Sequence, residues 1–92
     1  MKAKGSIFYC DGRKSEEREF KGKFVSLEEM QEIVGGYIQF VYWGSKIIVI
    51  HEEGKLLDFA INPFATAVYR DIIGVDDYIA GNVLIIDSKF VK

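Results

Sequence analysis

The sequence has little of several residue types that mark whole classes of small protein. Its 92 residues include one cysteine, one proline and one histidine. A single cysteine, Cys10, excludes an internal disulfide, and no Cys and His residues have the spacing of metal ligands. The chain is also too short for a core plus a deep, enclosed cofactor cavity. We therefore expect no structural metal, no disulfide framework and no cofactor.

Long hydrophobic runs and a strong net charge are also absent. The longest apolar runs, 37–43 and 46–50, are too short to cross a bilayer, and no N-terminal stretch has the pattern of a secretory signal. The net charge is −2 and the pI is about 5.3, so no overall field draws the chain to nucleic acid or to an anionic membrane. These features predict a cytoplasmic protein with no membrane partner, and nucleic acid is kept only as a minor alternative.

What the sequence does contain is enough apolar material for one core. Hydrophobic residues make up 49% and charged residues 28%, a composition that excludes intrinsic disorder. Two domains would each be too small to fold unaided, so we expect a single domain over residues 1–92. Residues 1–25 carry a net charge of +3 and residues 26–92 one of −5. We interpret residues 1–25 as a basic N-terminal hairpin, either solvated or facing an acidic partner, and residues 26–87 as the core.

Two helices have clear boundaries in the sequence. Ser26 and Glu29 have the spacing of a capping box, and Gly35 is placed to end the helix that follows. Asn62 is a good N-cap before a proline at the first helical position, and Gly74 lies just past the last apolar residue of that helix.

Strands alternate with turns in the remainder of the chain. We predict strands at 3–10, 18–24, 37–43, 46–51, 56–57 and 83–86. Four consecutive apolar residues at 47–50 indicate a central strand with both faces covered. The predicted fold is α+β, a mostly antiparallel sheet of five to six strands with two short helices packed on one face.

Motifs of catalysis are absent from the sequence. No glycine pattern matches a phosphate-binding loop, and no serine sits in a nucleophile elbow. His51 ends a predicted strand, and we interpret it as a hydrogen-bonded structural residue. The adjacent carboxylates at 52–53 and 76–77 point to opposite faces of an extended chain and suit turns better than a shared site. We therefore predict that the protein is not an enzyme, with unknown chemistry kept as a minor alternative.

Amphipathic side chains are the remaining candidates for a binding site. Five tyrosines and one tryptophan are many for a small domain, and these rings favour binding surfaces, although in strands they also fill cores. Asn62, Thr66 and Arg70 share one side of the second helix, where they face either solvent or a ligand or partner. The candidate binding residues are Tyr37, Tyr42, Trp43, Asn62, Thr66, Tyr69 and Arg70.

Four ordered segments resemble an uncharacterised family of small proteins from bacteria, their phages and plasmids. They are LEEMQEIVGGYI at 27–38, HEEGKL at 51–56, NPFAT at 62–66 and IAGNVLI at 79–85. The family commonly has Asn in place of His51. The resemblance covers about two-thirds of the chain. It implies an accessory protein of a mobile element inside a bacterial cell, and it brings no known activity.

Two hypotheses follow. The first is a small non-catalytic accessory protein that binds a host or phage protein, as an anti-defence inhibitor would; it predicts an exposed aromatic patch near Tyr42 and Trp43, or use of the basic hairpin. The alternative is a protein that binds or sequesters a small, nucleotide-like ligand in a concavity near Tyr37 and the second helix. Homo-oligomerisation through an edge strand or the aromatic face stays open.

Overall fold

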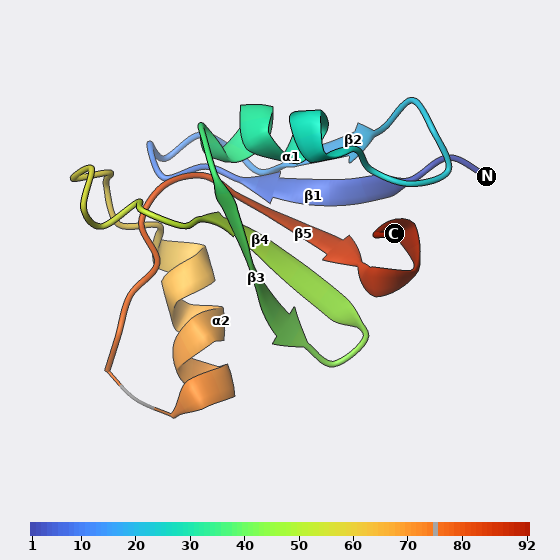
Figure 1. The fold of residues 1–92 in the computed structure, drawn as a ribbon. Helices are drawn as coiled ribbons and strands as arrows, with labels where there is room; N and C mark the ends of the chain where they lie inside the picture. Colours follow the sequence, from blue (N-terminus) through green and yellow to red (C-terminus); the bar gives the residue numbers. More distant parts are fainter. Residues whose placement is uncertain (75) are drawn as a thin grey trace.

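A computed structural model describes residues 1–74 and 76–92, which contain a five-stranded antiparallel sheet and two α-helices (Figure 1). In chain order the elements are β1 (Lys4–Phe8), β2 (Glu16–Glu19), α1 (Leu27–Val34), β3 (Ile38–Trp43), β4 (Lys46–His51), α2 (Pro63–Ile73), β5 (Val83–Asp87) and the 3₁₀ turn η1 (Ser88–Phe90). The strands follow the order β2-β1-β5-β4-β3, and every pair is antiparallel. The predicted α+β class is confirmed.

The last strand joins the two hairpins into one sheet. Within β5, Leu84 lies opposite Ile7 of β1 on one side and opposite Val49 of β4 on the other. All three side chains are buried in the same apolar cluster. The basic N-terminal hairpin therefore shares a sheet and a core with the rest of the chain.

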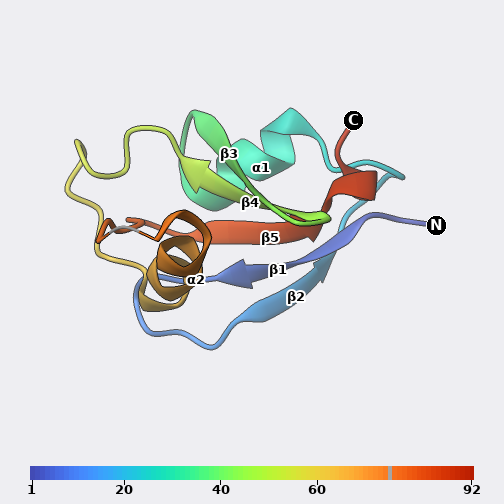
Figure 2. The same cartoon turned by 90° about the horizontal axis from the view of Figure 1, so that it is seen from below.

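The two helices cover opposite faces of the sheet, so the prediction that both pack on one face is wrong (Figure 2). Ile47 and Val49 of β4 pack with α1, whereas Ile48 and Ile50 pack with Ala65 of α2. Side chains alternate between the faces of a strand, so four consecutive apolar residues need a cover on each side. Each helix supplies one of these covers.

The predicted helix boundaries are confirmed by their caps. The Ser26 hydroxyl accepts from the Glu29 N–H at 3.1 Å, and the Glu29 carboxylate accepts from the Ser26 N–H at 2.9 Å. Gly35 ends α1 in the left-handed region with a φ of 92°, a conformation that glycine adopts without strain. In α2 the Asn62 side chain caps the first turn, and Gly74 ends the helix in the left-handed region. Within the described residues, no helix is both long and apolar enough to span a membrane.

Two strand predictions need correction. Residues 56–57 form part of a turn, in which the Leu57 N–H donates to the Glu53 carbonyl at 3.0 Å. A strand there would have no place beside β4, because β3 and β5 already occupy both edges of β4. The return strand of the first hairpin is β2, at Glu16–Glu19, instead of 18–24. The sheet accordingly has five strands in the described part of the chain.

Candidate binding groove

Asn62, a predicted site residue, is fully buried and uses its whole side chain inside the protein. Its amide oxygen accepts from the Ala65 N–H at 3.1 Å, which caps α2. Its amide nitrogen donates to the carbonyls of Phe8 and Gly81, both at 2.9 Å. The side chain therefore ties the start of α2 to the end of β1 and to the segment before β5, and it has no donor left for a ligand.

Thr66 also faces inward, so the expectation of a solvent-facing or ligand-facing stripe at Asn62 and Thr66 is wrong. The Thr66 hydroxyl accepts from the Ile79 N–H at 3.0 Å and donates to the Ile79 carbonyl at 3.3 Å. It thereby satisfies both backbone groups of a buried residue. The segment 76–80 is attached to α2 through this pair of hydrogen bonds.

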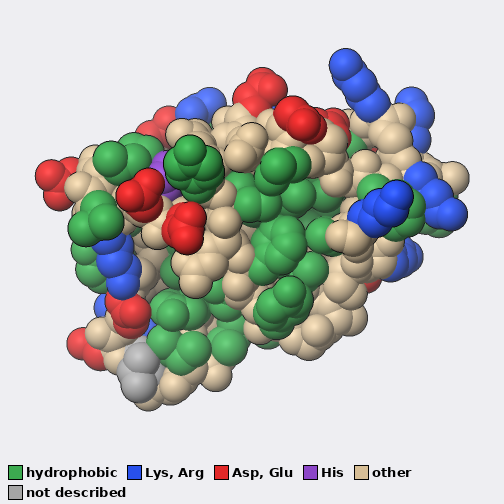
Figure 3. Space-filling model, viewed as in Figure 1, with side chains coloured by type: hydrophobic (Ala, Val, Ile, Leu, Met, Phe, Trp, Pro, Cys, Tyr) green, Lys and Arg blue, Asp and Glu red, His purple; other side chains and the backbone are tan. Residues whose placement is uncertain are grey.

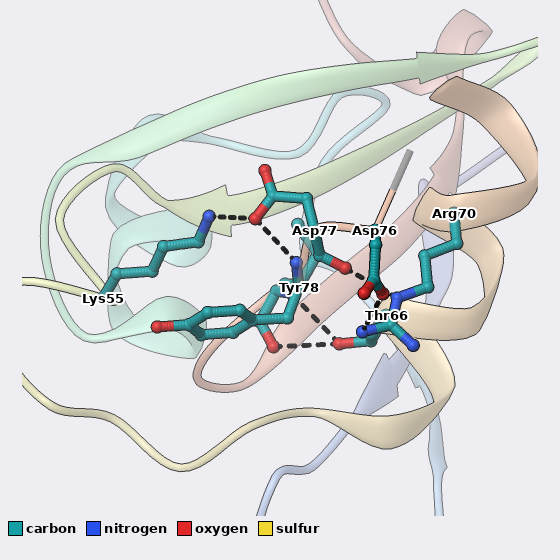
Figure 4. Close-up of polar contacts among 7 residues, drawn as sticks. Lys55, Thr66, Arg70, Asp76, Asp77 and Tyr78 are labelled. Atoms are coloured by element: carbon teal, nitrogen blue, oxygen red, sulfur yellow. Dashed lines mark hydrogen bonds and ion pairs between the residues drawn. The ribbon is translucent and has the colours of Figure 1, made fainter. Parts of the chain in front are cut away.

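Arg70, the third residue of the predicted stripe, is exposed and belongs to a chain of polar contacts (Figure 4). Its Nε donates to the Asp77 carbonyl at 2.8 Å, and its Nη2 lies 3.0 Å from an Asp76 carboxylate oxygen. The Asp77 carboxylate accepts from the Lys55 ammonium and, at 2.7 Å, from the Tyr78 N–H. Both cations of this region are therefore already paired with acidic groups.

The same contacts shift the ionisation of the partners. The hydrogen bond from the Lys55 ammonium, followed by the one from the Tyr78 N–H, holds the pKa of Asp77 below its usual value. The hydrogen bond to Asp77 raises the pKa of Lys55. The Lys55 ammonium also lies 4.6 Å from the centre of the Tyr78 ring, a cation–π contact. Lys55 is thus held in place by a carboxylate and by an aromatic face.

Lys55 and Tyr78 also line an open groove of about 300 Å³. The groove lies between the β3–β4 hairpin, the turn after β4, α2 and the segment 78–80. Its volume is at the lower end of the range for small-molecule sites, about 300–1,000 Å³. The apolar side chains that line it are Val41, Ile50, Leu56, Tyr69, Tyr78, Ile79 and Ala80.

The turn forms one wall of the groove because Gly54 permits a close backbone contact. A Cβ atom at Gly54 would lie 2.8 Å from the Ala80 carbonyl oxygen, so only glycine fits there. His51, at the start of the turn, is buried; its Nδ1 accepts from the Glu53 N–H at 2.9 Å and its ring packs edge-on against Phe59. His51 is thus buried and hydrogen-bonded, as expected for a structural residue at the end of a strand.

The rim of the groove is acidic. Glu52 and Glu53 both line it and are exposed. Residues 51–79 as a whole contain six Asp or Glu residues and only two Lys or Arg residues, Lys55 and Arg70. Since both of these cations are paired with carboxylates, a ligand that enters the groove meets the negative charges of Glu52 and Glu53. The groove therefore favours an apolar or cationic occupant.

Three predicted residues lie outside the groove: Tyr37, just before β3, and Tyr42 and Trp43 at the end of β3. Tyr37 and Tyr42 are about two-thirds exposed and Trp43 is 40% exposed. Tyr42 makes an edge-on contact with Phe40, with the ring centres 6.4 Å apart. Hydrophobic side chains gather over β3 in the middle of the face drawn in Figure 3. The predicted exposure of rings near Tyr42 and Trp43 is confirmed.

Of the seven predicted site residues, Tyr69 is the one that lines the groove. Lys55, Leu56, Asp77 and Tyr78 are not among the residues predicted from the sequence to bind; Asp77 was considered only in the carboxylate pair 76–77, and Tyr78 only as one of the five tyrosines. The groove forms where the turn after β4 meets segment 76–80, two parts of the chain that are about 20 residues apart. No local pattern encodes that meeting. The adjacent carboxylates at 52–53 and the family-like segment HEEGKL at 51–56 both indicated the turn, but neither predicts the groove.

The fold and the groove define a small α+β domain with an open, acid-rimmed groove between a hairpin and a helix. The family described as "Domain of unknown function (DUF3846)" matches residues 3–89, and the chain belongs to this family. No curated protein and no solved structure matches the chain. In residues 1–74 and 76–92, no group of three or more His, Cys, Asp or Glu side chains could hold a metal ion.

Proposed function

We propose that the protein is a non-catalytic binding protein that recognises another protein through the groove. The observation that carries this proposal is the exposure of large apolar side chains at the rim. Leu56 is 80% exposed and lines the groove, and its neighbour Leu57 is 53% exposed. Exposed leucines beside an apolar concavity are characteristic of protein–protein contact surfaces.

The partner segment inserts an apolar side chain between Leu56, Tyr69 and Tyr78 and places a Lys or Arg side chain near Glu52 and Glu53. The two carboxylates supply the charge complementarity for that basic side chain. An apolar anchor with a flanking charge is a common arrangement at the centre of small interfaces.

The setting we propose is the cytoplasm of a bacterial cell, with a protein of the host as the partner. This part of the proposal is supported by the resemblance of residues 27–86 to accessory proteins of phages and plasmids. Such proteins commonly act by binding and blocking, so an anti-defence inhibitor is the specific role proposed. This role is proposed by analogy with the resembling accessory proteins.

A small, nucleotide-like ligand is the alternative occupant. The groove's volume and its two tyrosine rings, Tyr69 and Tyr78, support it, because aromatic rings can stack on a planar base. The electrostatics oppose it: a phosphate would meet Glu52 and Glu53, and Lys55 would have to leave Asp77 to bind it. A protein segment is therefore the preferred occupant.

The test compares two leucine variants of the tagged protein recovered from bacterial lysate and measured by native mass spectrometry. Leu56→Ser removes the rim side chain. Leu27→Ser is the matched control, because Leu27 is 51% exposed on α1, on the other face of the sheet. Both side chains are exposed, so both variants should keep the melting temperature within a few degrees of the unaltered protein.

We expect one partner of tens of kilodaltons on the unaltered protein and on Leu27→Ser, with its occupancy at least tenfold lower on Leu56→Ser. A mass of a few hundred daltons that leaves on denaturation would instead favour the small-ligand alternative. Equal capture by both variants would contradict the groove as the binding surface.

A further inference from the structure

The two edges of the sheet differ sharply in charge. The edge strand β2 has the sequence EERE, four charged residues in a row, and charged edges resist pairing with other chains. The edge strand β3 has the sequence IQFVYW, without a charge or a proline. In the described residues, β3 ends the sheet and no strand pairs with its outer side. One edge is thus protected and the other is open.

The open edge of β3 presents a regular set of backbone groups. The Tyr37 carbonyl accepts from the Glu52 N–H at 2.9 Å, so position 37 faces β4. The direction of backbone groups alternates along an antiparallel strand, so Gln39, Val41 and Trp43 also face β4. Ile38, Phe40 and Tyr42 therefore point three N–H groups and three carbonyls away from the sheet, while α1 packs mainly over β4 and β5.

We propose that β3 pairs with β3 of a second copy of this chain, antiparallel, about a two-fold axis that passes beside Phe40. In this register Phe40 lies opposite Phe40 of the second copy, and Ile38 lies opposite Tyr42. These are the three residues whose backbone groups point outward, so all six groups of each strand find a partner. The symmetry is the isologous kind that most dimers use.

The same register brings the exposed side chains of β3 together. On the α2 face, Tyr37 of each copy lies opposite Trp43 of the other. On the α1 face, the exposed Tyr42 ring covers Ile38. Aromatic cross-strand pairs of this kind stabilise antiparallel sheets, and here they would cover three of the large apolar side chains that the monomer leaves exposed.

The charges beside β3 fit an antiparallel pair. Glu52 flanks the start of β3, next to Tyr37, and Lys46 pairs with Trp43 at its end. Both residues lie on the β4 side of β3, so in the antiparallel pair each acidic side chain faces the basic one of the second copy across two strands, about 14 Å apart, which is a weak attraction. A parallel pair would instead set like charges opposite each other at the same distance. Charge therefore favours the antiparallel orientation, and the matched outward backbone groups and the exposed aromatic side chains select a second copy as the occupant.

The dimer is independent of the proposed partner and compatible with it. A two-fold axis perpendicular to the sheet keeps the faces in register, so both grooves would lie on the same face of a ten-stranded sheet. A partner with two matching segments would then bind with increased avidity. Failure of the dimer would leave the groove proposal unaffected.

The first test measures mass by sedimentation velocity over about two decades of protein concentration. We expect a concentration-dependent shift from the 10.5 kDa monomer to twice that mass. Tyr42→Pro removes one outward N–H without removing a bond to β4, and should weaken dimerisation at least tenfold. Tyr42→Thr keeps the N–H and is the matched control, expected to weaken it less. A monomer at every concentration, or a dimer indifferent to Tyr42→Pro, would overturn the proposal.

The second test reads the register by disulfide formation, with Cys10→Ser as the background. The chain carrying both Tyr37→Cys and Trp43→Cys should form a covalent dimer on oxidation, because directly opposite residues have Cα atoms about 4.5–5.5 Å apart. In a variant with one cysteine, that cysteine lies about 20 Å from the same cysteine of the second copy in this register, so it should not cross-link. Cross-linking of the single variants, or none in the double variant, would overturn the register.

Discussion

The Thr66 hydroxyl shows how much one side chain can contribute to the placement of the groove. It bonds both backbone groups of Ile79, a residue that is 5% exposed. Buried peptide groups cost free energy when they lose their partners. Since Ile79 and Tyr78 form one wall of the groove, the hydroxyl contributes to stability and to the shape of the site.

We predict that Thr66→Val lowers the free energy of unfolding by about 1–3 kcal/mol, because it leaves both Ile79 groups without the hydroxyl. Thr66→Ser keeps the hydroxyl and should cost only about 0.8 kcal/mol, the value of one buried methyl group. Urea unfolding of the two variants measures the difference. A valine variant at least as stable as the serine variant would show that the hydroxyl contributes nothing.

The residues of α2 also show what the sequence could not reveal about the site. The spacing of Asn62, Thr66 and Arg70 is visible in the sequence, and their location on one side of a helix follows from it. The groups that Asn62 and Thr66 bind are the backbones of Phe8, Gly81 and Ile79, which are distant along the chain. Side-chain spacing shows that polar residues share one side of a helix. Only the fold shows whether their hydrogen-bonding groups are already used within the protein.

At the level of elements, the groove depends on the turn after β4 and on segment 76–80 staying together. The contact of Lys55 with Asp77 and the close approach of Gly54 to Ala80 hold them. Both partners of the ion pair are more than a third exposed, so the pair fixes position more than it adds stability. The pKa of Asp77 is lowered in the folded state, which makes this link dependent on pH.

We predict that the melting temperature of the unaltered protein exceeds that of Asp77→Asn at pH 6, and that the difference shrinks as the pH falls below about 4. The sign follows from the lowered pKa: the unfolded state takes up the proton first, so the stabilisation is complete above the unfolded pKa and is lost on acidification. Thermal unfolding between pH 6 and pH 2.5 measures it.

Asp76→Asn is the control for the pH experiment. Its carboxylate is 90% exposed and pairs with Arg70 at the surface, so its removal should change the melting temperature little at any pH. A constant difference between the unaltered protein and Asp77→Asn across the pH range would contradict the role of the Asp77 charge.

Local signals predicted the helices well and the sheet only in part. Ser26, Gly35, Asn62 and Gly74 define helix ends through side-chain and backbone chemistry that spans a few residues. The position of β5 between β1 and β4 depends on pairing across the whole chain, which no short pattern encodes. The sequence also could not show which face of the sheet each helix covers, because the apolar run of β4 presents two equivalent faces to a helix.

At the scale of the whole molecule, charge is separated along its length. The protein extends over 37 × 25 × 23 Å. Lys and Arg side chains gather at the end that carries the N-terminus, whereas the groove lies in the acidic region of residues 51–79 (Figure 3). The basic end is a second surface that could bind a partner, and its charge would favour an acidic partner. A measurement that maps contact must therefore distinguish the two ends.

Hydrogen exchange on the protein with its recovered partner tests the central claim most directly, with the free protein as reference. If the groove is the binding surface, amide exchange slows in residues 50–57 and 76–80 when the partner is bound, while residues 1–25 exchange as before. Slower exchange confined to residues 1–25, with the groove unchanged, would contradict the account.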